Sequence, residues 1–329
     1  MYGVGERAHR AQAAIPRFTN SSDPGTILSA VLHCPAMSTP VRMVQPESAP
    51  RPAPRFSLGR HVYGLAAIAF GIVSLVWHDF GAPWQQIRAL GNIPHQVFLV
   101  YVAAGIELFG GIAIQWRKTA RVGALALAII YLAWALLWVP HIIREPRVYD
   151  RYGNFFEQLS IFSGALLVYA CFERNGLQAV GNSTENRGAL APERLRQPSL
   201  ARLGYIFFAI CVVSFTLEQV FYLRGTASFV PKWIPPGQMF WAIATTIFFA
   251  LASIALFSGR FALIASRLLT AMIVGFQLLI WLPAPLADPH KLINWAGNAQ
   301  NLAIAGAAWI VADYLGANRW KKLEPASGL

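Results

Sequence analysis

The sequence predicts an all-α, polytopic membrane protein. Of its 329 residues, 56% are hydrophobic and only 13% are charged, about half the charged fraction usual in a soluble domain. The apolar residues are gathered into segments of about 20 residues, the length at which a helix crosses the hydrocarbon core of a bilayer. These segments do not alternate apolar and polar residues as the strands of a membrane barrel do. Composition therefore argues against a water-soluble enzyme and favours membrane-spanning helices.

Residues 1–57 differ from the rest of the chain. They hold eight of the 21 prolines, scattered Arg residues and no run long enough to form a core. This composition indicates a disordered cytoplasmic tail. Met43 precedes the first membrane entry at Arg60, so translation starting at Met43 is expected to give a protein that inserts and folds normally.

Eight candidate spans follow Arg60, each long enough to cross the bilayer as a helix. They are Val62–Phe80, Val97–Trp116, Val122–Ile143, Phe155–Phe172, Leu203–Leu223, Met239–Ser258, Phe261–Pro283 and Ala299–Leu315. A polar linker, residues 173–202, separates the first four from the last four, and a short cytoplasmic tail, 317–329, follows the eighth. The predicted domains are thus two four-helix units, residues 58–172 and 203–316.

The distribution of Lys and Arg predicts the orientation in the membrane. With the N-terminus inside, 20 of these residues fall on the cytoplasmic side and 7 on the other. Omitting the tail before Met43 leaves 16 against 7. Because cytoplasmic loops carry the excess of positive charge, both termini are predicted to be cytoplasmic, in the inner membrane of a prokaryote.

The two halves resemble each other. Trp138–Pro140 in the first half corresponds to Trp281–Pro283 in the second, 143 residues later. Gly153–Asn154 corresponds to Gly297–Asn298, 144 residues later. Each unit has an even number of spans, so both units enter the membrane from the same side. The sequence therefore predicts a parallel repeat, with its symmetry axis along the membrane normal.

Three segments resemble the DoxX family of four-helix membrane proteins. Gly105–Gly111, with the basic turn Arg117–Arg121, is similar to its second-to-third-helix region. Phe229–Pro236 is similar to its loop between helices one and two, and Asn301–Gly306 to its fourth helix. The resemblance implies a tandem pair of DoxX-like units and a link to redox or sulfur stress. The family is named after a membrane subunit associated with an archaeal thiosulfate:quinone oxidoreductase, and no catalytic residue set carries over.

Glu107 is the first candidate functional residue, because it lies near the middle of the second span. An ionised carboxyl group there costs several kcal/mol unless it is paired, hydrated or protonated. It could relay protons or contact a quinone, or it could be a protonated acid that holds the bundle together. Phe249 occupies the repeat-equivalent position, so only the first half keeps an acid there.

Further candidates are expected at the extracytoplasmic ends of the spans. They are His78, Asp79, His95, His141 and Glu157. A quinone head group is bound through a hydrogen-bond donor, such as His, near the membrane interface. Helix ends also carry such residues simply because they meet water. Two of the histidines could ligate a haem only if they face each other within the bundle. Glu218, Gln277, Asn298, Gln300 and Asn301 form the polar set of the second half, where hydrogen bonding between helices is the simpler explanation.

Other classes of function receive no support from the sequence. Basic residues lie between the spans and form no nucleic-acid-binding face, although the net charge is +12. The three cysteines have no metal-ligand or redox spacing, so no metal site is predicted.

Three functions remain open. The first is a membrane component of a redox system, which interacts with the quinone pool or anchors an oxidoreductase subunit. The second is a transporter or channel for a small solute, and the third is a structural subunit without activity. Besides the lipid bilayer, an oxidoreductase subunit and a second copy of the chain are the partners considered.

The predicted topology can be tested with a reporter fused after Ser183. Because four spans precede this residue and the N-terminus is inside, the reporter should read cytoplasmic. An extracytoplasmic reading would show that the number of spans in the first half is wrong.

Overall fold

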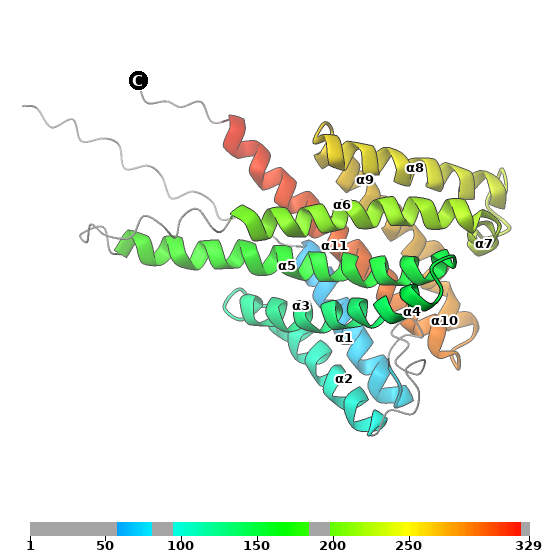
Figure 1. Cartoon of the computed structure of the whole chain (residues 1–329), viewed down its shortest axis with the longest axis horizontal. Helices are drawn as coiled ribbons and strands as arrows, with labels where there is room; N and C mark the ends of the chain where they lie inside the picture. The colour runs from blue at the N-terminus through cyan, green and yellow to red at the C-terminus, as the bar shows by residue number, and fades with distance from the viewer. Residues whose placement is uncertain (1–57, 81–94, 184–197, 324–329) are drawn as a thin grey trace, which may run out of the picture. The chain divides into compact units, whose positions relative to one another are not determined.

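A computed structural model describes residues 58–80, 95–183 and 198–323. All described residues belong to one compact unit within residues 52–329. These residues form helices and no strand, which confirms the predicted all-α class (Figure 1). The expected disordered tail, 1–57, lies outside the described residues.

The helices of the first half correspond to the first four predicted spans. They are α1 (Leu58–Trp77), α2 (Gln96–Ala113), α3 (Ala120–Leu137), α4 (Val139–Arg144) and α5 (Tyr149–Ser183). The helices of the second half are α6 (Pro198–Phe221), α7 (Leu223–Phe229), α8 (Gln238–Ser258), α9 (Ala262–Phe276), the π-helix η4 (Gln277–Trp281), α10 (Pro283–Ala287) and α11 (Leu292–Leu323).

Seven segments among the described residues are long and apolar enough to cross a membrane. They are α1, α2, α3 with α4, the part of α5 up to Phe172, the part of α6 from Leu200, α8, and α9 with η4 and α10. The chain is therefore that of a multi-pass membrane protein. The predicted eighth span, 299–315, lies within α11 but is not among the seven, and Gln300, Asn301 and Asp313 make it more polar.

Prolines break two of the predicted spans. Pro140 has no N–H, so it cannot bond to the carbonyl group of Leu136, and the third span divides at Trp138 into α3 and α4. The seventh span passes through η4 and ends at Pro283, the first residue of α10. Conversely, α5 continues to Ser183, beyond the predicted end at Phe172, so the first third of the expected linker is helical.

Helices of both halves share one apolar core. Consecutive long helices pack together in the order α1–α2–α3–α5 in the first half and α6–α8–α9–α11 in the second. The halves join where α1 packs on α11, α5 packs on α6, and α5 meets α11 (Figure 1). The span of α5 is the most enclosed, with 67% of it buried, against 28% for α8. Residues on α5 and α11 are therefore best placed to contact both halves.

Glycine allows close contact between the helices of the first half. A Cβ atom on Gly111 of α2 would lie 2.7 Å from the carbonyl oxygen of Gly64 on α1. On the next helix pair, a Cβ atom on Gly123 of α3 would lie 2.7 Å from the carbonyl oxygen of Gly110. Gly105 differs, because a Cβ atom there would meet nothing within 4 Å. Close approach thus requires Gly111 and Gly123, but not Gly105.

Gly111→Ala should destabilise the protein, because the new methyl group meets backbone that cannot move aside; overpacking of this kind costs about 1–3 kcal/mol. Gly105→Ala is the matched control on the same helix and should be neutral or slightly stabilising, since Ala favours the helix. Thermal unfolding at a fixed scan rate compares the two. Equal midpoints for both variants would contradict the contact between α1 and α2.

Candidate functional site

The Glu107 carboxyl group is enclosed by the first three helices. Glu107 is 1% exposed, and the indole Nε1 of Trp134 on α3 donates a hydrogen bond of 3.4 Å to its Oε1 atom. Tyr131 lies one turn before Trp134 on α3, and Tyr63 lies on α1; both phenols are within electrostatic reach of the carboxyl group. The structure therefore surrounds this acid with aromatic side chains that carry polar groups.

The two tyrosine hydroxyl groups near Glu107 differ in their partners. Tyr63 donates a 2.8 Å hydrogen bond to the carbonyl oxygen of Ile161 on α5. The Tyr131 hydroxyl group is buried and has no hydrogen-bond partner among the described residues. An unpaired buried hydroxyl group costs about 1–3 kcal/mol. Tyr131 therefore has an unused donor that lies within the electrostatic field of Glu107. We call Glu107, Tyr131 and Trp134 the Glu107 centre.

A second cluster connects the two halves. Gln300 on α11 donates from Nε2 to the Oε2 atom of Glu157 on α5, at 2.5 Å. Gln158, the next residue on α5, donates from its own Nε2 to the Oε1 atom of Gln300, at 3.1 Å. Gln158 is fully buried, and its Oε1 atom has no partner among the described residues. Glu157, Gln158 and Gln300 thus form a polar bridge across the interface between the halves.

A carboxyl group from the second half reaches the same place. A Cβ atom on Gly153 of α5 would lie 2.8 Å from the carboxyl atoms of Glu218 on α6, so this group rests against the glycine. Gly153 and Glu157 are four residues apart and therefore lie on one face of α5. Glu218 accordingly approaches Glu157, and its electrostatic field acts on the Glu157 carboxyl group. The second half thus does contribute an acid, although not opposite Glu107.

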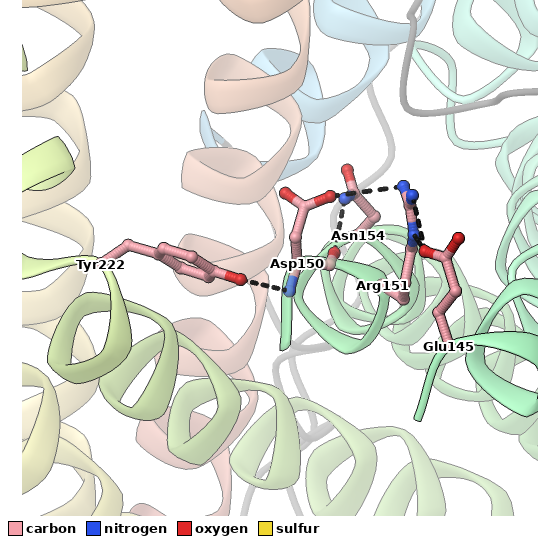
Figure 2. Close-up of polar contacts among 5 residues, drawn as sticks. All are labelled: Glu145, Asp150, Arg151, Asn154 and Tyr222. Carbon is pink, nitrogen blue, oxygen red and sulfur yellow. Dashed lines mark hydrogen bonds and ion pairs between the residues drawn. The ribbon is translucent and has the colours of Figure 1, made fainter. Parts of the chain in front are cut away.

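The acids at the start of α5 have basic partners. Figure 2 shows Arg151 between two carboxylates, 2.9 Å from Glu145 and 3.6 Å from Asp150. The backbone N–H of Asp150 donates to the hydroxyl group of Tyr222 after α6, at 3.2 Å, and Asn154 donates to the carbonyl oxygen of Asp150 at 2.6 Å. These contacts hold the start of α5 against the end of α6. In the described part of the chain, Glu157 and Glu218 have no such ion pair.

The remaining amides of the second half have a structural role. Asn301 donates from Nδ2 to Oε1 of Gln277, and Gln277 donates from Nε2 to Oδ1 of Asn298, both at 2.7 Å. Asn298 in turn donates to the carbonyl oxygen of Trp281, at 2.8 Å. Pro285 has no N–H to reach that carbonyl oxygen, so the amide replaces the missing helical bond. Hydrogen bonding between helices, the simpler explanation, accounts for these three residues.

The other predicted site residues lie apart. His78 bonds through Nδ1 to the hydroxyl group of Tyr101, at 2.9 Å, and Asp79 accepts from the N–H of Phe80, also at 2.9 Å. His95 precedes α2. His141 is buried in α4 with its ring 5.5 Å from that of Trp138, and its Nε2 atom has no partner among the described residues.

The predicted residues do not form one site. Glu107 contacts Trp134, Glu157 contacts Gln300, and His78 contacts Tyr101. No group of three or more His, Cys, Asp or Glu side chains in the described ranges is arranged to hold a metal ion. Phe249, the counterpart of Glu107, is buried between Phe215 and Phe276. The second half therefore fills this position with a purely apolar cluster.

Sequence reasoning missed Tyr131, Gln158 and Gly153. The spacing of Tyr131 and Trp134 indicated a shared helix face, and Gln158 is the neighbour of a candidate acid. Nothing in the sequence indicated that Glu218 rests on Gly153, because that contact joins helices from different halves. Comparison of the chain with family models, curated proteins and solved structures gives no match.

Gln300→Leu should lower the stability of the protein, because it leaves Glu157 and Gln158 without their partner on α11. The loss of buried hydrogen bonds of this kind costs about 1–3 kcal/mol each. The control is Gln96→Leu at the start of α2, which should change the unfolding midpoint little. If both variants have the unfolding midpoint of the wild type, the polar bridge does not stabilise the interface.

Proposed function

We propose that this protein is an integral membrane component of a redox system and that Glu107 exchanges a proton with a carrier of the quinone class. The Glu107 centre is the observation that carries this proposal. It contains a buried acid, the indole group that donates to it, and the Tyr131 hydroxyl group, which has no partner in the described part of the chain.

The energetic cost of Glu107 supports a functional role. A charged Asp at the centre of a membrane helix costs about 2.5–3.5 kcal/mol on the insertion scale. Packing alone does not require this cost, because Phe249 fills the counterpart position with an apolar ring. Intramembrane acids retained against such a cost commonly mark proton pathways or ligand sites.

The chemistry of the Glu107 centre fits a quinone. A quinone carbonyl oxygen accepts hydrogen bonds, and Tyr131 has the unused donor that this requires. The Glu107 carboxyl group can hold the proton that accompanies reduction and release it again. A bound quinone would supply the electron-carrying chemistry, while the surrounding aromatic side chains exclude water.

The finer architecture belongs to the same proposal. We propose two tandem DoxX-like units with eight spans, α11 providing the eighth, and both termini cytoplasmic in a prokaryotic inner membrane. The matching helix order in the two halves and the excess of Lys and Arg on one side support it. His78, His141 and Glu157 are the further residues proposed to act in proton exchange, and an oxidoreductase subunit is the proposed partner.

One observation favours a second function, the transport of a small solute coupled to protons or cations. The polar bridge and Glu218 lie where the two halves meet, which is where repeat-built transporters bind their solutes. If proteoliposomes containing the protein take up a solute, and the flux depends on Glu157, the protein is a transporter and not a redox component.

Tyr131→Phe and Glu107→Gln should each lower the amount of quinone that co-purifies with the protein. The first removes the unused donor without breaking an internal hydrogen bond, and the second keeps the shape of the acid while removing its titration. Quinone in lipid extracts of purified protein is the measurement.

Glu145→Gln, at an exposed acid, is the control and should retain the wild-type amount. Wild-type protein without bound quinone, or equal amounts in all variants, would contradict the proposal and leave Glu107 as a structural contact.

A further inference from the structure

Arg60 is a buried cation that uses only part of its hydrogen-bonding capacity. It lies in the first turn of α1 and is 4% exposed, with its guanidinium carbon 5.4 Å from the centre of the Phe172 ring. Its Nη2 atom donates to the carbonyl oxygen of Gln115 at 3.1 Å and contacts Nε2 of His61 at 3.4 Å. The Nε and Nη1 atoms are buried and have no acceptor among the described residues.

The neighbours of Arg60 cannot supply the missing acceptors. His61 and Gln115 bond to each other through Nδ1 and Oε1, at 2.6 Å, so Nδ1 carries the hydrogen and Nε2 is left to face Arg60. The Gln115 amide nitrogen is directed at the carbonyl oxygens of Gly111 and His61, at 3.1 and 3.4 Å. Neither side chain bonds to Nε or Nη1, so these two nitrogens of Arg60 remain without an acceptor among the described residues.

The electrostatic surroundings of Arg60 are positive. The field of Arg117, which is also a cation, acts on Arg60. Arg117 and Lys118 are exposed in the turn between α2 and α3, two and three residues after Gln115. Among the described residues Arg60 has no ion-pair partner, and a buried charge without one costs several kcal/mol, so this arrangement calls for an anion.

We propose that Arg60 binds the phosphate group of an anionic phospholipid, with Arg117 and Lys118 at the level of its head group. The phosphate oxygens would accept hydrogen bonds from Nε and Nη1, the two atoms that lack partners. The location fits, because α1 begins and α2 ends here, where membrane-spanning helices meet the head-group layer. Basic sites between helices at this level are suited to anionic lipids. Free phosphate has the same chemistry, and a separate measurement with inorganic phosphate distinguishes the two sources.

The test uses the full-length chain in nanodiscs of phosphatidylcholine, with and without phosphatidylglycerol, and compares unfolding midpoints. A ligand that binds only the folded state raises the unfolding midpoint. Phosphatidylglycerol should therefore raise the midpoint of the wild type. In Arg60→Gln, phosphatidylglycerol should no longer raise the midpoint. In Arg117→Gln the rise should be smaller, and this substitution does not threaten folding because position 117 is exposed. Arg147→Gln, an exposed cation after α4, is the control and should keep the full rise.

A further arm adds inorganic phosphate to the phosphatidylcholine discs. No change there assigns the site to the lipid, whereas an Arg60-dependent rise assigns the same phosphate chemistry to the free ion. If Arg60→Gln does not fold, an unchanged rise in Arg117→Gln overturns the proposal. The proposal is also overturned if phosphatidylglycerol raises the unfolding midpoints of Arg60→Gln and the wild type equally.

Discussion

Surrounded by hydrocarbon, a buried polar atom must find its partner within the protein or in a ligand, because no water is there to replace one. This constraint separates two kinds of polar residue in the bundle. Gln277, Asn298 and Asn301 bond to one another and to the carbonyl oxygen of Trp281 that Pro285 leaves open. These bonds are complete, and they explain why the residues are there. Tyr131 and Arg60 keep atoms without partners among the described residues, and packing does not explain them.

The two halves of the chain use the same helix order for different purposes. In the second half, the counterpart of Glu107 is Phe249, packed among aromatic rings. In the first half, the acid remains, and most of the buried polar atoms without partners among the described residues are found there, on Arg60, Tyr131, Trp138, His141, Asn154 and Gln158. The second half contributes Glu218 and Gln300 at the interface instead. The first half is therefore where binding is expected, and the second half completes it.

Sequence reasoning found the apolar helices because their length and composition depend only on the bilayer. It placed Glu107 inside the bundle, where the structure buries it, since a residue in the middle of a span has few other places to go. It missed the breaks at Trp138 and at η4, although Pro140 and Pro283 were visible, because an apolar run does not reveal where a helix pauses. It could not pair Glu218 with Gly153, or Gln300 with Glu157. Such contacts depend on how helices distant in the sequence meet.

We infer that complete polar bonds hold the bundle together, whereas the unused donor of Tyr131 serves a ligand. The most direct measurement compares the thermal unfolding of Asn301→Leu and Tyr131→Phe in detergent after bound lipid and quinone have been extracted, so that no ligand contributes to the midpoint. Asn301→Leu should unfold at a clearly lower temperature, because it breaks two hydrogen bonds. Tyr131→Phe should unfold with the wild type or above it. If Tyr131→Phe loses as much stability as Asn301→Leu, the hydroxyl group has a structural partner and the account is wrong.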